Sequence, residues 1–293
     1  GRELGFAFGI NLTIARLGSF SADWMPTWVP SAFSSWRSPL VIAAAIGTLC
    51  AISALAYGAL EARANRRYGL GAAGETDKLV LSDLFRFTKS YWFVVALCVT
   101  FYSAIFPFRG FSIKFFIEAW NLTREAAGQY NSVLPLAAMF ATPLFGLLVD
   151  KVGKRALFMV FGSFLMMPVF LMMAYHVAPL VVPVAMMGIA FSLIPAVMWP
   201  SVAYIVDEKR LGTAYAVMTL IQQVGVMLMP LAIGFLNDHY QASAENPAGH
   251  IAGMWAFSIL GFLALFFAIM LRKEETGPNA HGLETITASS SKE

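Results

Sequence analysis

Arg16 is the residue whose type and position most strongly indicate chemistry. It lies inside an apolar run that begins near Leu4, so an α-helical rise places it about 18 Å along that helix. A charged side chain at that depth is costly unless it faces a water-filled cavity or a partner, which favours the binding of a carboxylate by its planar guanidinium. The alternative is that Arg16 pairs with a carboxylate in helices that precede this segment and only fixes their packing. Asn11, in the same run, is a second candidate binding residue.

Aromatic and amide side chains inside other apolar runs supply further candidates for contact with a solute. They are Tyr102 and Phe106, Trp199, and the pair Gln222 and Gln223. A buried glutamine needs hydrogen-bond partners, so we expect one of the pair to face a cavity and the other a neighbouring helix.

Pro107 interrupts the apolar run that contains Tyr102 and Phe106. Proline removes a backbone donor and clashes with the preceding turn of a helix. The sequence therefore predicts either a helix broken toward its end, which would act as a hinge, or a simple proline kink.

The sequence gives no support for an enzymatic function. There is no Ser-His-Asp order, no His-Glu-x-x-His pattern and no phosphate-binding Gly-rich loop. Cys50 and Cys98 both lie in apolar runs, where a thiol behaves as a small hydrophobe, so we expect no disulfide framework, metal site or cofactor. The net charge of +3 is small and its cations are dispersed, which argues against nucleic acid as a partner.

The elements that must position these residues are membrane-spanning helices. Hydrophobic residues make up 58% of the chain and charged residues 13%, about half the usual charged fraction of a soluble protein. A bilayer core about 30 Å thick needs roughly 20 apolar residues in a helix. We predict eight such spans, at residues 4–22, 39–58, 91–116, 126–149, 156–175, 179–203, 211–236 and 252–271.

Lys and Arg gather in alternate connections between these spans. The second, fourth and sixth connections and the segment after the last span are basic, whereas the third, fifth and seventh carry one arginine between them. The positive-inside rule therefore predicts that both termini of this chain lie in the cytosol.

The chain divides into four predicted parts. Residues 1–58 hold two spans, residues 59–90 form a polar cytosolic linker with a short surface helix, residues 91–272 hold six spans, and residues 273–293 form a disordered tail.

We also expect Gly225 and Gly234 to allow close approach between helices.

A charged turn and several longer stretches carry a family resemblance. The turn is Leu148-Val-Asp-Lys-Val-Gly-Lys-Arg-Ala-Leu157, and the longer stretches are Trp199-Pro-Ser-Val-Ala-Tyr204, Glu208-Lys-Arg-Leu-Gly-Thr-Ala-Tyr215 and Ala15-Arg-Leu-Gly-Ser19. Over nearly the whole chain this resembles the major facilitator superfamily. The resemblance implies an all-α membrane fold of twelve helices, of which the eight spans here correspond to helices five to twelve, the first four being absent.

The same resemblance implies a function and gating residues. It implies a monomeric alternating-access transporter of a small organic solute, such as a dipeptide or a related zwitterion or anion. Asp150, Gly153 and Arg155 would form a latch against the start of the first span, with Pro107 as a further gating residue; the alternative is that Asp150 is a solvated loop charge. A bacterial inner membrane is the expected location, with the lysosomal membrane as the alternative.

The titratable residues of the predicted spans bear on whether transport is coupled to protons. No Asp, Glu or His lies near the middle of any predicted span, where a proton-coupled carrier needs a group that changes charge. A uniporter is therefore expected. The alternatives are a proton-coupled symporter of organic anions with its proton site in the preceding helices, a channel, and a membrane scaffold without transport.

Overall fold

The computed structural model describes residues 14–25, 37–69, 86–278 and 280–285, except for the side chains of Pro39 and Asp150. Within these ranges every regular element is helical, and seven helical stretches are long and apolar enough to cross a membrane. The all-α prediction is therefore confirmed. The first predicted span is described only from residue 14, as a short helix over residues 14–25, and the predicted surface helix in the linker lies mostly outside the described residues.

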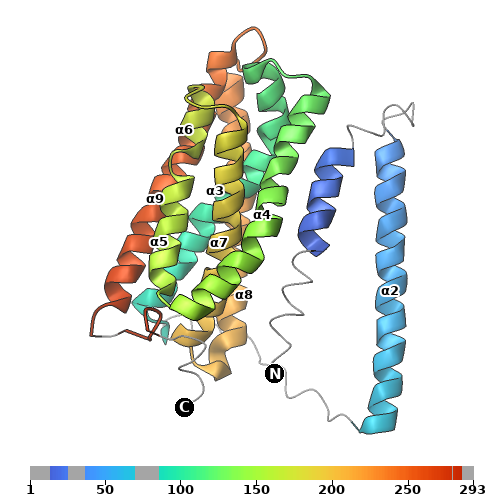
Figure 1. Ribbon diagram of the computed structural model, residues 1–293, viewed down its shortest axis with the longest axis vertical. Coiled ribbons are helices and arrows are strands. Elements are labelled where there is room, and N and C mark those ends of the chain that lie inside the picture. Colours follow the sequence, from blue (N-terminus) through green and yellow to red (C-terminus); the bar gives the residue numbers. More distant parts are fainter. Residues whose placement is uncertain (1–13, 26–36, 70–85, 279, 286–293) are drawn as a thin grey trace.

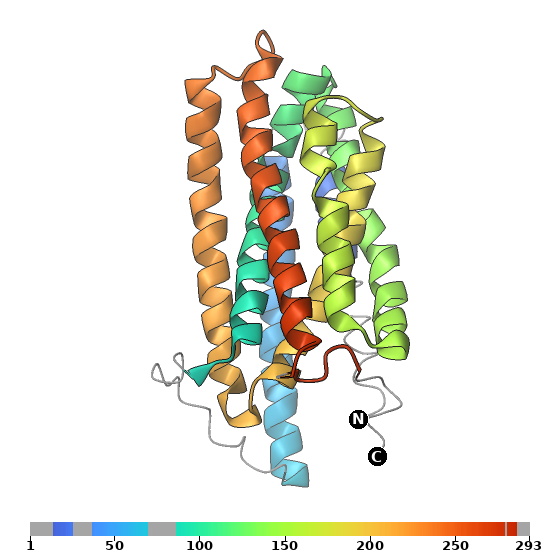
Figure 2. The same cartoon turned by 90° about the vertical axis from the view of Figure 1, so that its left-hand side faces the viewer.

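Six of the apolar stretches form one bundle (Figures 1 and 2). Its helices are α3 (Lys89–Trp120), α4 (Arg124–Val152), α5 (Arg155–Met166), α6 (Val169–Ala174), α7 (Val181–Ile205), α8 (Leu211–His239) and α9 (Ile251–Glu275), with the short helices η3 (Glu208–Arg210) before α8 and η4 (Pro247–His250) before α9. α4 packs along α7, α3 along α8 and α9, and α5 against α7 and α9. α3 is the most buried of these helices.

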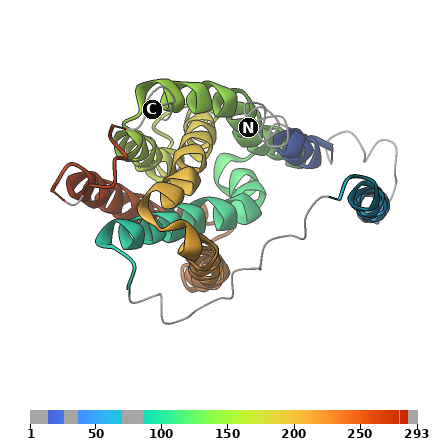
Figure 3. The ribbon, with the colours of Figure 1, turned by 90° about the horizontal axis from the view of Figure 1, so that it is seen from below.

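α2 (Ser38–Tyr68) stands apart from this bundle (Figures 1 and 3). The apolar side chains along it are exposed, as expected of a helix that lipid or further helices cover. It continues ten residues past the predicted end at residue 58, because it stops only where Gly69 adopts a left-handed φ of 57° and its N–H caps the carbonyl of Asn65. The first part of the predicted linker is therefore helical.

Proline affects helix continuity differently at two places in the bundle. α3 runs without a break through Pro107, so the predicted broken helix is not found and only the alternative of a local proline kink remains. The predicted span at residues 156–175 is confirmed, since Arg155–Ala174 is one stretch long and apolar enough to cross a membrane. Its helix is interrupted within the span, because α5 ends at Met166 and α6 begins after Pro168. Proline cannot donate a backbone hydrogen bond, which is the physical reason for the interruption.

One end of the bundle collects the basic residues, and we call it the basic end. They are Lys151, Lys154, Arg155, Lys209, Arg210, Arg272 and Lys273. Residues 280–285 return to this end and pack against it below α5 and α9 (Figure 2). Leu283 is fully buried there. The expected disorder of the tail is therefore not found for these residues, and residues 286–293 lie outside the described part of the chain.

Glycines permit close contacts between helices at specific positions. A Cβ on Gly188 of α7 would lie 2.5 Å from the carbonyl oxygen of Leu134 on α4. A Cβ on Gly225 of α8 would collide with Ser103 on α3, as predicted, whereas a Cβ on Gly234 would meet no atom within 4 Å among the described residues, so the prediction for Gly234 was wrong. α7 and α8 thus approach their neighbours through glycine.

Replacing Gly188 by alanine should lower the apparent Tm of the detergent-solubilised protein. Overpacking of a close contact costs about 1–3 kcal/mol, and backbone atoms cannot move aside as a side-chain end can. Gly234→Ala is the matched control: it has space, and alanine favours a helix over glycine, so its Tm should be equal to or above the wild-type value. Equal Tm values for the two variants would contradict the close contact of α7 with α4.

Candidate functional site

Arg16 projects from the short helix at residues 14–25 toward α7. Its guanidinium carbon lies 4.0 Å from the centre of the Phe191 ring, a cation–π contact. The side chain is half-buried, and it forms no ion pair with any carboxylate that the structure describes. The guanidinium therefore keeps N–H donors available for an anionic partner.

Two aromatic side chains of α3 lie against the Phe191 ring at this contact. Tyr102 and Phe106 on α3 stack with their centroids 5.3 Å apart, and Phe191 meets both rings edge-on. The indole N–H of Trp199 on α7 donates to the Tyr102 hydroxyl over 2.9 Å. We call Arg16, Tyr102, Phe106, Phe191 and Trp199 the Arg16 cluster.

Trp199 also joins α8 to the cluster. Its ring stacks on Tyr215 with centroids 5.9 Å apart, and the Tyr215 hydroxyl donates to the Trp199 carbonyl over 2.9 Å. Hydrogen bonds and ring contacts thus link α3, α7 and α8 around one basic group. An anion with an apolar body fits such a site, because the arginine supplies charge and the rings supply apolar surface.

An ion pair lies two helical turns from Arg16. Asp23 accepts a hydrogen bond from Arg109 on α3 over 2.6 Å, with the two side chains 16% and 20% exposed. Asp23 follows Arg16 by seven residues and so lies on the same face of its helix, and Tyr102, Phe106 and Arg109 form the facing stripe on α3. Arg109 therefore joins two segments that are distant in sequence.

The two glutamines occupy different surroundings. Gln222 is buried, and its amide oxygen accepts a hydrogen bond from the Cys98 thiol over 3.3 Å. Cys98 lies on α3, one helical turn before Tyr102. Gln223 is exposed on α8. The prediction that one glutamine faces a neighbouring helix is confirmed for Gln222. Asn11 lies outside the described residues.

The predicted latch residues lie at the basic end. Asp150 belongs to the last turn of α4, but its side chain lies outside the structural description. Gly153 has a φ of 72° and Lys154 one of 43°, which turn the chain into α5. Arg155 is 5% exposed, and its guanidinium carbon lies 4.6 Å from the Tyr204 ring centre at the end of α7.

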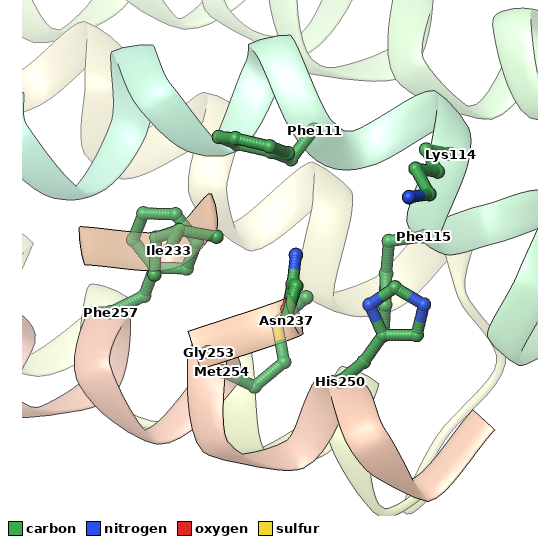
Figure 4. A pocket seen from close by; sticks show the side chains of 9 residues that line it. All are labelled: Phe111, Lys114, Phe115, Ile233, Asn237, His250, Gly253, Met254 and Phe257. Atoms are coloured by element: carbon green, nitrogen blue, oxygen red, sulfur yellow. The ribbon is translucent and has the colours of Figure 1, made fainter. Parts of the chain in front are cut away.

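A small cavity is lined by Phe111, Lys114 and Phe115 of α3 together with residues of α8 and α9 (Figure 4). It has a volume of about 10 Å³, room for about one water molecule, between α3, α8 and α9. His250 lines it and pairs with Glu118 over 2.8 Å. This cavity is too small for an organic solute.

Sequence reasoning missed Phe191 and Asp23 as members of this site. Phe191 carried no signal beyond its aromatic character. Asp23 fell just beyond the predicted span, although its seven-residue spacing from Arg16 would have placed both on one helical face.

The seven apolar helical stretches define a multi-pass integral membrane protein. The family model that matches the sequence, over residues 108–291 and so over more than half of the chain, is the Major Facilitator Superfamily. The chain belongs to this family of membrane transporters.

Known relatives are named lysosomal dipeptide transporters. The chain is 34% identical over 249 residues to Lysosomal dipeptide transporter MFSD1 of Danio rerio, covering 81% of this chain and 54% of the relative. The proteins of the same name from Homo sapiens and Gallus gallus are 33% and 31% identical over the same share of this chain, which covers 53% and 56% of them. The chain thus spans about half the length of these relatives.

Proposed function

We propose that the full-length protein is an alternating-access transporter of dipeptides or closely related zwitterions and anions, and that it works as a uniporter. The observation that carries this proposal is the half-buried Arg16 guanidinium, which lies over Phe191 and pairs with no described carboxylate. A cation held in an apolar membrane region needs an anionic partner, and a solute carboxylate meets that need. The printed name of the relatives supports the choice of dipeptides.

In this proposal the Arg16 cluster forms one wall of the solute site. Arg16 binds the carboxylate, while Tyr102, Phe106 and Trp199 contact the apolar part of the solute. Gln222 and Gln223 on α8 supply amides, and Asn11 a further polar group. Helices that precede this segment, corresponding to family helices one to four, complete the opposite wall.

Two devices would alternate the access to this site. The turn at Asp150, Gly153 and Arg155 closes the basic end, and the Asp23–Arg109 ion pair closes the other end. Exchange between the two closed states gives alternating access. Pro107 contributes at most a local kink to this movement.

The positive-inside rule assigns the basic end to the cytosol. A bacterial inner membrane is the proposed location, with the lysosomal membrane as the alternative that the names of the relatives favour. The proposed protein acts as a monomer. We propose uniport because the predicted spans carry no carboxylate or histidine near their middle that could bind and release a proton. A proton-coupled symporter of organic anions is the second candidate.

A thermal-shift screen of the full-length protein tests the proposed solute class. Dipeptides should raise its Tm in a concentration-dependent way, whereas sugars should not, because ligand binding to the native state stabilises it by mass action. Arg16→Ala should abolish the shift without lowering the Tm of the unliganded protein by more than a few degrees. A shift produced by sugars alone, or one that survives in the Arg16→Ala variant, would overturn the proposed site.

A further inference from the structure

The last described residues bind back onto the basic end of the bundle. We call residues 280–285 the C-terminal strap. Leu283 and Glu284 bind the start of α5, which is distant in sequence, and His281 binds the end of α9, six residues before it. A polar tail with no role would not bury Leu283 completely.

Glu275 anchors one side of the strap. This last residue of α9 is buried, and its Oε1 accepts from the Ser90 hydroxyl at the start of α3 over 2.6 Å. The same oxygen pairs with His281 Nδ1 over 2.8 Å, and Oε2 accepts from the His281 backbone N–H over 2.9 Å. One buried carboxylate thus holds α9, α3 and the strap together.

The other side of the strap caps α5. The residue at the N-cap of α5 is Lys154, whose ammonium cannot accept a hydrogen bond from a helix N–H. The strap supplies the acceptors instead: the Leu283 carbonyl accepts from the Arg155 N–H over 2.8 Å, and Glu284 Oε1 accepts from the Leu157 N–H over 2.9 Å. A carboxylate at this position is also favoured by the positive end of the helix dipole.

The capped residue belongs to the turn that we assign to gating. Arg155 is buried and contacts the ring of Tyr204 at the end of α7, the helix that carries Phe191 and Trp199. We propose that the C-terminal strap positions the gating turn, with Leu283 and Glu284 as positioning residues that control solute translocation and not solute binding. This inference rests on the proposed function.

Two truncations separate the strap from the residues after it. A stop after Thr285 removes only residues 286–293 and is the matched control; a stop after Glu275 removes the strap as well. The control should exchange labelled dipeptide at the wild-type rate in liposomes. The shorter protein should bind dipeptide within twofold of the wild-type Kd but exchange it at least fivefold more slowly. Wild-type exchange by the shorter protein, or a loss of binding that matches the loss of exchange, would overturn the proposal.

A pair of substitutions tests the cap itself. Glu284→Gln keeps an oxygen acceptor for the Leu157 N–H and should retain more than half of the wild-type exchange rate. Glu284→Ala removes that acceptor and should retain less than a third. Equal rates for the two variants contradict a positioning role for Glu284.

Limited trypsin digestion gives a readout that does not depend on transport. Without the strap, the turn at Lys151 and Lys154 should be cut at least threefold faster than in the protein that ends at Thr285. Unchanged cutting would overturn the inference even if transport differs. If the wild-type protein neither binds nor exchanges dipeptides while the cutting rates still differ, the proposed function fails and the positioning of the turn by the strap stands.

Discussion

Replacing Arg16 by lysine is expected to lower uptake of a labelled dipeptide by the full-length protein at least tenfold. The positive charge is kept, but the planar fork that binds a carboxylate through two N–H groups is lost, as is much of the contact with the Phe191 ring. A charge-assisted hydrogen bond contributes about 1.5–3 kcal/mol, which corresponds to a ten- to hundredfold loss.

Arg63→Lys is the matched control for this substitution. Arg63 lies exposed on α2, so the same chemical change should leave uptake within twofold of wild type. Uptake at the wild-type rate by the Arg16→Lys protein would reduce Arg16 to a residue that fixes packing.

Exchanging the charges of Asp23 and Arg109 is expected to rescue a loss that each single reversal causes. Asp23→Arg places two arginines together, and Arg109→Asp places two carboxylates together, so each should lower uptake more than tenfold. Leaving one member of a half-buried pair without its partner costs up to about 3–5 kcal/mol, the value for a fully buried pair. The double variant restores opposite charges and should recover uptake to within about fourfold of wild type.

The double-mutant cycle separates a gate from two independent effects. Losses that simply add in the double variant would show that the two charges act independently. Wild-type uptake by either single variant would contradict the assignment of this pair to the gate. Purified single and double variants should have equal yields, which controls for failure to fold.

The membrane helices could be predicted because their signal is local. A run of about 20 apolar residues has few alternatives to a membrane helix. The ends were less well predicted, since α2 runs ten residues past the predicted end to Gly69. Arg16 could be singled out for the same reason, since a charge within such a run is unfavourable without a function or a partner. Only the structure shows that the Arg16 guanidinium has no described carboxylate partner and is therefore available to an anion.

The contacts between distant segments could not be predicted. Phe191 is one phenylalanine among 25, and only the packing of α7 against the helix at residues 14–25 brings it under Arg16. The strap was missed because a polar segment predicts disorder unless the helix ends that it caps are known. Proline gave no reliable guide: α3 continues through Pro107, whereas the chain breaks before Pro168, because neighbouring helices decide whether a lost backbone hydrogen bond is tolerated.

Counterflow in liposomes tests the central claim most directly. Full-length protein reconstituted with unlabelled dipeptide inside should take up labelled dipeptide without a pH gradient, and an imposed pH gradient should not drive a zwitterionic dipeptide above its equilibrium concentration. The Arg16→Lys protein serves as the inactive control. Uphill accumulation that depends on the pH gradient and is abolished by an uncoupler would contradict uniport, and the absence of any counterflow would contradict dipeptide transport itself.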